Sequence, residues 1–298
     1  MSMPQTAIVL RRSLRRLFLA LAAVGSLAFP LQANTAISLP NFASPPGLTF
    51  VGDATTVNTQ TTDGTVLRLT PSLPTNQAGA AYFTTPITLG TGGYFSTTFQ
   101  FRFTAVAGHT PGDGITFFLA ENPSGLGAVG SDLGYGVAAG VPNSIAVEFD
   151  TYKNGAADNN SSNHIAIDTN GQITNTAAQN VYGQADCSTS AYVSGCMSNG
   201  DLWTVTIAYN ATYLSVTAQD GRSAAPFAAI SSFPINIDSY LGGNTAYAGF
   251  TSSTGSGSEN HNILNWTFDP TTPTPEPATL ATLFGGLGAL ALAKRRRP

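Results

Sequence analysis

The chain has 298 residues with 31 Gly, 18 Pro and only 9% charged residues, a composition that excludes a charge-rich helical protein and is typical of short strands joined by turns. Residues 34–270 contain 4 Lys and Arg against 15 Asp and Glu, a net charge of −11 with His neutral. This acidity excludes nucleic acid as the expected partner, because nucleic acid requires basic patches.

The first 33 residues have the pattern of a secretory signal peptide. The basic stretch "RRSLRR" precedes an apolar run from Leu17 to Leu31, and "LQA" ends at a cleavage site after Ala33. The run is short for a membrane span. We therefore expect a short helical targeting segment over residues 1–33 and export of the remaining chain.

Residues 34–270 predict a single all-β domain, an antiparallel β-sandwich (jelly roll). Short stretches of alternating apolar and polar residues recur between turn residues, and "YNATYLSV" predicts a hairpin that turns at Asn210. Trp203 and Trp266 lie inside such stretches and are expected in the core, whereas His109 and His261 are expected in surface loops. The predicted strands include residues 94–103, 114–120, 144–150, 202–209, 213–218, 246–253 and 263–268.

The stretch "SIAVEFDTYKNGAADNNSSNHIAID" (144–168) places several metal-ligating residue types on two predicted strands. Strand alternation puts Glu148 and Asp150 on one face, and pairing of the two strands would bring His164 beside them. Carboxylate and amide oxygens are suited to Ca²⁺, and two carboxylates with an imidazole are suited to an ion such as Mn²⁺. The alternative at this stage is a solvated polar edge with a surface histidine.

A catalytic role for the same acids is disfavoured by Lys153. A retaining glycosidase needs two carboxyl groups about 5–5.5 Å apart across a cleft. Sandwich glycosidases of the laminarinase type carry an E-x-D-x-x-E strand, and Lys153 occupies the position of its last acid. Glycoside hydrolysis is therefore the weakest of the functions considered.

Cys187 and Cys196 are the only cysteines. In an exported chain, an even pair that close in sequence predicts a disulfide that closes the loop "CSTSAYVSGC".

Residues 271–298 combine a Pro-rich spacer, an apolar stretch from Ala278 to Ala293 and a basic tail. The order "PEP", short helix and arginine cluster resembles a PEP-CTERM sorting signal. The resemblance implies a Gram-negative exporter in which an exosortase-type membrane transpeptidase removes the tail. The expected localisation is export through the inner membrane, transient anchoring by the C-terminal helix, and release to the cell surface or outside.

Stretches over residues 36–269 resemble, in order, those of legume-type (L-type) lectins, which have a concanavalin-like sandwich fold. The stretches are "GAAYFTTPITL", "YFSTTFQFRF", "GDGITFFLAENP", "SIAVEFDTYKN…NHIAID", "WTVTIAYNATYLSV" and "AYAGFTSSTGSGSENHNILNWTF".

The resemblance implies a site for Ca²⁺ and a transition metal, with Mn²⁺ expected. Glu148 and His164 would hold the transition metal, and Asp150 would bridge to Ca²⁺. The Ca²⁺ shell would be completed by the Tyr152 carbonyl, the Asn154 side-chain oxygen, and either Asp158 or Asn159.

The resemblance also implies a sugar site centred on Asp113, whose carboxylate accepts hydrogen bonds from two sugar hydroxyls and whose preceding peptide is cis. Tyr152 offers a ring face to the pyranose and Asn154 donates its amide. The loop "GSDLGYG" places Ser131, or Gly130, where the family donates a backbone N–H. Gly255 and Ser256 occupy the loop that sets specificity.

The sequence thus predicts an exported, Ca²⁺-dependent, non-catalytic protein that binds a glycan or exopolysaccharide and that gains avidity from multivalency, with a homo-oligomer as one route. The alternative is a structural protein of the extracellular matrix that keeps the fold and metals and binds no sugar.

Overall fold

A computed structural model of the chain describes residues 36–90, 92–123, 125–136, 140–180, 187, 195–222 and 225–270. The chain divides into two compact units, residues 1–33 and 34–298, and every described residue belongs to the second. The predicted signal peptide (1–33) and sorting signal (271–298) lie outside the described residues.

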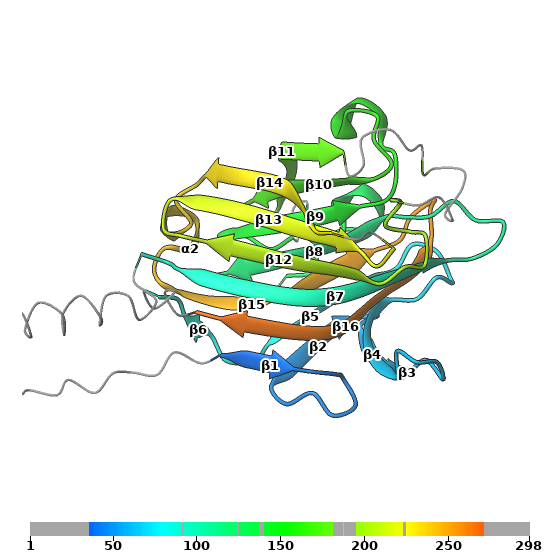
Figure 1. The fold of residues 1–298 in the computed structure, drawn as a ribbon, viewed down its shortest axis with the longest axis horizontal. Coiled ribbons are helices and arrows are strands. Elements are labelled where there is room, and N and C mark those ends of the chain that lie inside the picture. Colours follow the sequence, from blue (N-terminus) through cyan, green and yellow to red (C-terminus); the bar gives the residue numbers. More distant parts are fainter. Residues whose placement is uncertain are drawn as a thin grey trace, which may run out of the picture. The chain divides into compact units, whose positions relative to one another are not determined.

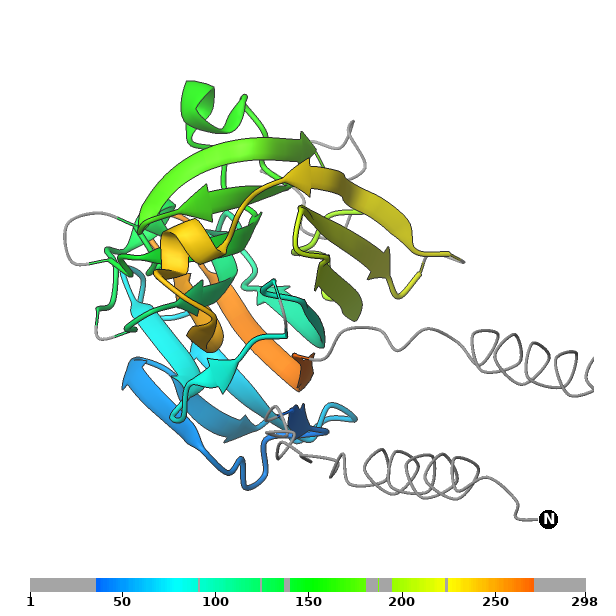
Figure 2. The same ribbon diagram turned by 90° about the vertical axis from the view of Figure 1, so that its left-hand side faces the viewer.

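Two antiparallel sheets form a sandwich, as the sequence predicted. In Figure 1 the sheet with β12, β13, β7 and β16 lies in front of the sheet with β8, β9 and β15, and Figure 2 shows the same strands turned by 90°. The front sheet has the order β14 (Phe227–Pro234), β13 (Tyr213–Asp220), β12 (Trp203–Tyr209), β7 (Phe95–Ala105), β16 (Glu259–Asp269), β4 (Thr65–Thr70) and β3 (Thr55–Asn58), with β1 (Ile37–Leu39) paired to β16. The back sheet has the order β11 (Gln172–Asn180), β10 (His164–Thr169), β9 (Ser144–Asp150), β8 (Gly114–Ala120), β15 (Thr245–Ser253), β5 (Ala78–Phe83) and β2 (Leu48–Gly52), with β6 (Ile87–Thr88) paired to β15.

The core lies between the two sheets and is rich in aromatic side chains. On β7 the residues alternate between buried and half-buried, because successive side chains of a strand point to opposite faces. Phe99 of β7 packs edge-to-face on Phe250 of β15 with ring centroids 5.0 Å apart, and Trp266 packs on the same ring. Trp203 and Trp266 are fully buried, which confirms the prediction for both tryptophans.

The predicted hairpin is present, since β12 and β13 pair in register from Trp203 with Asp220 to Tyr209 with Leu214. Asn210 closes its turn by accepting hydrogen bonds from the backbone N–H groups of Thr212 and Tyr213.

The outer face of the back sheet carries a second, smaller apolar cluster. Phe118, Ala120 and Ala146 point to this face and pack with Tyr135 and Val141 from the segment before β9. Every residue of β9 is therefore buried, although alternate residues point away from the main core. Glu148 and His164 are fully buried and Asp150 has 2% of its surface exposed, which excludes the alternative of a solvated polar edge with a surface histidine.

The predicted localisation, with transient membrane anchoring by a C-terminal helix, needs correction. A helix needs about 20 apolar residues to span a bilayer. Among the described residues no helix is long and apolar enough to cross a membrane, and the α-helix found there, α2 (Asp238–Leu241), has four residues.

Cys187 and Cys196 form the predicted disulfide. The bonded segment is tied to the residues that precede β10. The Cys187 N–H donates to the Ser162 hydroxyl at 2.9 Å, and Asn163 accepts from the Met197 N–H at 2.9 Å and donates to the Gly195 carbonyl at 2.8 Å. The disulfide thus supports the chain just before His164.

We expect replacement of both cysteines by serine to lower the free energy of unfolding by about 2–3 kcal/mol, because the disulfide closes a short loop in the unfolded chain. Urea unfolding of the variant and of the oxidised wild type measures the difference. Reduced wild type should match the variant, and equal stability of the oxidised protein and the variant would contradict this role.

Candidate functional site

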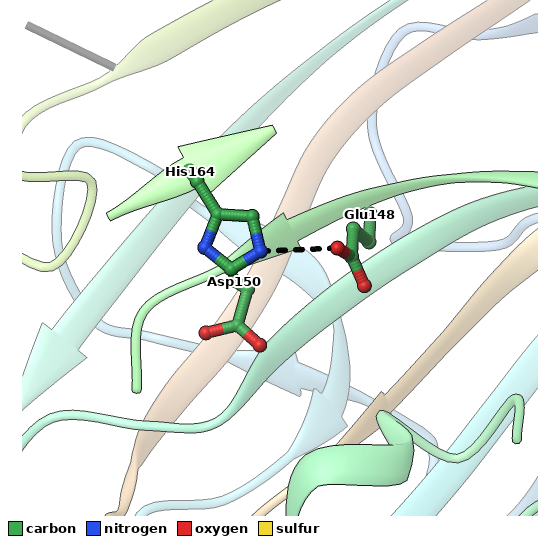
Figure 3. Close-up of side chains that lie close together, drawn as sticks. All are labelled: Glu148, Asp150 and His164. Atoms are coloured by element: carbon green, nitrogen blue, oxygen red, sulfur yellow. Dashed lines mark hydrogen bonds and ion pairs between the residues drawn. The ribbon is translucent and has the colours of Figure 1, made fainter. Parts of the chain in front are cut away.

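Glu148, Asp150 and His164 form a buried cluster at the ends of two paired strands (Figure 3). The register of β9 and β10 places His164 directly opposite Asp150. Glu148 lies two residues from Asp150 on β9, opposite Ala166. One potential ligand atom from each residue lies within 4.8 Å of the others, and His164 Nε2 lies 3.1 Å from Glu148 Oε1. This is the proximity that strand pairing predicted.

Several polar atoms of this region lack a hydrogen-bond partner among the described residues. They include Glu148 Oε2, Asn154 Oδ1 and His164 Nδ1, all of them buried. An unpaired buried polar atom is costly and requires an explanation. Clustered carboxylate, amide and imidazole groups are the ligand types of a divalent cation. The residues therefore fit a metal site.

Asp158 and Asn159 differ sharply in their placement. Asp158 ends the short helix η2 (Gly155–Asp158) with 4% of its surface exposed, and its carboxylate accepts a hydrogen bond from the Asn154 N–H. Asn159 is exposed, in a left-handed conformation that follows the helix. Asp158 thus lies with the buried acids, whereas Asn159 points to solvent.

The acids of the site have raised pKa values in the protein without metal. Burial raises the pKa of Glu148 and Asp150 well above their usual range, and repulsion from neighbouring acids adds to both rises. Burial also raises the pKa of Asp158. The cause is the cost of placing carboxylate charge away from water, which a bound cation would offset.

These shifts predict an unusual pH dependence of stability without metal. A carboxyl whose pKa is higher in the folded than in the unfolded state binds protons more tightly when folded, so stability falls as pH rises between the two pKa values. For EDTA-treated protein we expect the Tm to fall by several degrees from pH 5 to pH 7.5, and to recover at pH 7.5 on addition of Ca²⁺ and Mn²⁺. Differential scanning calorimetry tests this, and a Tm that rises over this pH range in EDTA would contradict it.

Asp113 lies where three loops converge, and Gly114, which follows it, pairs with Asp150 of the acid–histidine cluster. Its exposed fraction is 1%, its Oδ2 has no hydrogen-bond partner among the described residues, and the peptide Gly112–Asp113 is cis, as the resemblance implied. A Cβ on Gly255 would lie 3.0 Å from Asp113 Oδ2 and 2.8 Å from the Gly130 Cα. Only glycine at 255 therefore allows these loops to approach so closely.

Burial raises the pKa of Asp113 to about 7, and repulsion from Glu259 adds to the rise, whereas the Gly255 backbone N–H opposes it. The backbone of Asp113 is held as well, because the Thr151 N–H donates to the Asp113 main-chain carbonyl at 2.8 Å. Asp113 is therefore a fixed buried acceptor with one oxygen unused by the described residues.

The other residues predicted for the sugar site differ in exposure. Tyr152 is half-buried, and its ring covers backbone: a Cβ on Gly112 or on Gly257 would lie 2.9 or 2.6 Å from Tyr152 Cδ2. Asn154 is half-buried, whereas Ser131 and Ser256 are exposed at the tips of their loops. Tyr152 thus joins the Asp113 loop to the last loop.

Comparison with known proteins identifies the family. A model of the legume lectin domain matches residues 35–282. The chain belongs to the legume lectin family. Members of this family are carbohydrate-binding proteins, so this lectin is a non-catalytic carbohydrate-binding protein rather than an enzyme.

Several curated relatives of this lectin are plant proteins. A lectin of Leucomphalos mildbraedii is 30% identical over 235 residues, which cover 74% of this chain and 89% of that protein. Agglutinin-2 of Cladrastis kentukea is 34% identical over 184 residues, which cover 59% and 57%. A probable L-type lectin-domain containing receptor kinase of Arabidopsis thaliana is 28% identical over 78% of this chain, which spans only 36% of the kinase.

Solved lectin structures share the fold. The lectin from Bauhinia forficata in complex with GalNAc aligns with a TM-score of 0.63 and 24% identity, covering 80% of this chain and 98% of that lectin. The metal-free form of lectin I-B4 from Griffonia simplicifolia aligns with a TM-score of 0.63 and 24% identity over 79% and 98%. Both alignments confirm the predicted concanavalin-like sandwich.

A buried pair of side chains near the Asp113 loop of this lectin was not predicted from the sequence. His261 was expected in a surface loop, but it is fully buried on β16, because the strand begins two residues earlier at Glu259. His261 Nε2 lies 3.3 Å from Glu259 Oε1, which also accepts the Thr151 hydroxyl at 2.5 Å. The pair therefore supports Thr151, which in turn holds Asp113. Strand alternation could have predicted this burial, because His261 lies two residues before Ile263, which faces the core, and therefore points to the same side of the strand.

Proposed function

We propose that this lectin binds a glycan through Asp113 in a manner that depends on Ca²⁺ and a transition metal such as Mn²⁺. The observation that carries the proposal is the buried Asp113 carboxylate, whose Oδ2 is unused by the described residues and which lies where the Gly130 and Gly255 loops meet. Two sugar hydroxyls suit such an acceptor, since hydrogen bonds to an ionised group are the stronger kind.

Glu148, Asp150 and His164 would hold the transition metal, with Asp150 shared between two ions. Asp158, Asn154 and the Tyr152 carbonyl would complete the Ca²⁺ shell, and the burial of Asp158 favours it over Asn159. These acids would lose their mutual repulsion with a cation bound between them. The chain's part is to fix the loop from Thr151 to Asn163, which carries Tyr152 and Asn154 beside Asp113.

Around the sugar, Tyr152 would offer its ring to the apolar side of a pyranose. Asn154 would donate its amide, and the backbone at Ser131 or Gly130 would donate an N–H. The exposed Ser256, next to Gly255, would contact the part of the glycan that differs between sugars.

A single shallow site of this kind binds weakly, so we infer that avidity comes from a repetitive ligand such as an exopolysaccharide, or from homo-oligomers. An exosortase-type partner for residues 271–298 rests on the PEP-CTERM resemblance alone.

A glycan array tests the proposal. We expect signals for a defined group of glycans in Ca²⁺ and Mn²⁺, their loss in EDTA, and their return when the metals are restored. If the metal-loaded protein binds no glycan, a structural protein of the matrix becomes the better description, and if the signals persist in EDTA, the metal dependence is wrong.

A further inference from the structure

A pocket whose lining does not include Asp113 opens on the outer face of the front sheet. It has a volume of about 430 Å³, and we call it the β4 pocket; its lining includes Arg68, Arg102, Asp63, Thr62, Thr104 and Asn262. Strands β3, β4, β16 and β7 lie side by side beneath it (Figure 1).

The strand register concentrates positive charge at this pocket. Arg68 of β4 pairs with Asn262 of β16, which pairs with Arg102 of β7, so that two arginines flank one asparagine in a row across three strands. Leu67 and Leu69 are fully buried in the core, so Arg68 points outward. Residues 34–270 contain only four Lys and Arg in all, and two of them line this one pocket.

Arg102 is already neutralised within the pocket. Its Nε and Nη2 donate to the two carboxylate oxygens of Asp63 at 2.8 and 3.0 Å, and its Nη1 donates to the Gly200 carbonyl. Asp63 belongs to the turn between β3 and β4, which the Thr59 N–H closes on the Gly64 carbonyl. The pocket therefore already contains one bidentate ion pair, that of the Arg102 guanidinium with the Asp63 carboxylate.

Arg68 has no acidic partner of this kind among the described residues. Its Nε donates to Asn262 Oδ1 at 2.9 Å, and its two terminal nitrogens hydrogen-bond to no described residue. It forms no ion pair with a described acid, although it is half-buried and desolvation lowers the pKa of its guanidinium. With two arginines and one aspartate the pocket has a net charge of +1, and the pair of terminal N–H groups on Arg68 matches the two oxygens of a planar or tetrahedral oxyanion.

We propose that the β4 pocket binds the oxyanion of an acidic saccharide unit, a uronate carboxylate or a sulfate ester, through the end of Arg68. Threonine hydroxyls such as those of Thr62 and Thr104 are placed to contact sugar hydroxyls. The volume suits a monosaccharide unit and exceeds the needs of a free ion. The site is separate from the sugar site proposed at Asp113 and does not depend on it.

Titration calorimetry of the metal-loaded full chain tests the proposal with three probes: polygalacturonate, its methyl ester and sodium sulfate. We expect Arg68→Gln to weaken binding of polygalacturonate at least tenfold and Arg222→Gln, a change at an arginine outside the pocket, to leave it unaltered.

The methyl ester should bind far more weakly than polygalacturonate. Arg68-dependent binding of sulfate alone would assign the site to a free inorganic oxyanion. Equal binding of polygalacturonate by Arg68→Gln and wild type, or equal binding of the ester, would overturn the proposal. If Arg68→Gln fails to fold, the Asp63→Asn variant tests the proposal instead. This change releases Arg102 from its acidic partner and should tighten binding of polygalacturonate. Unchanged or weaker binding would overturn the proposal.

Discussion

Replacement of Asp113 by Asn is expected to weaken glycan binding by at least about 100-fold while the fold is retained. The change preserves the shape of the side chain and removes the charge that makes its hydrogen bonds to sugar hydroxyls strong. Each hydrogen bond to a charged group contributes about 1.5–3 kcal/mol, so the weakening of two corresponds to roughly two decades in Kd or more. Titration calorimetry with the best glycan of the array measures the loss.

Asp53→Asn is the matched control, because Asp53 is an exposed aspartate that also accepts a backbone N–H, from Ala78 at 3.2 Å. The control should bind as wild type does. An Asp113→Asn variant that keeps an affinity within about twofold of wild type would show that the sugar binds elsewhere.

Replacement of Glu148 by Gln is expected to have an equally large effect on the metal. Loss of one carboxylate from a cluster of two acids and a histidine should lower the affinity for the transition metal at least 100-fold, since changes even to groups around the ligands of a metal cost about 10–100-fold. Elemental analysis of dialysed protein measures the bound metal, and glycan binding should be lost with it.

The same variant should behave in the opposite way without metal. Glu148 is fully buried, and desolvation raises its pKa, so in EDTA at pH 7.5 the Gln variant should have a higher Tm than wild type. With Ca²⁺ and Mn²⁺ present, the wild type should be the more stable. Glu121→Gln, at an exposed acid, should change neither result, and full retention of metal by Glu148→Gln would remove Glu148 from the ligand set.

Local sequence patterns predicted much of the fold and the proximity of the acids and the histidine in the candidate metal site. Alternation along residues 144–168 predicted that Glu148, Asp150 and His164 share a face, and the pairing of β9 with β10 brings them together. Such patterns are reliable because side-chain direction along a strand is fixed by the backbone. The disulfide could also be predicted from the sequence, because the chain has only two cysteines and they are close in sequence.

Features that depend on distant segments were not predicted. Glu148 is fully buried although it shares the outer face of β9 with Ala146, which packs against Tyr135 and Val141 from the segment before β9. The support of Asp113 by Glu259 through Thr151 joins three separate parts of the chain. The β4 pocket likewise requires the register of three strands distant in sequence, which no local pattern encodes.

The most direct test of a metal-supported sugar site at Asp113 is a crystal structure with Ca²⁺, Mn²⁺ and the best glycan of the array. We expect an anomalous Mn²⁺ peak among Glu148, Asp150 and His164, and sugar hydroxyls within hydrogen-bond distance of the Asp113 carboxylate. A glycan bound away from Asp113, or a Mn²⁺ peak away from these three residues, would contradict it.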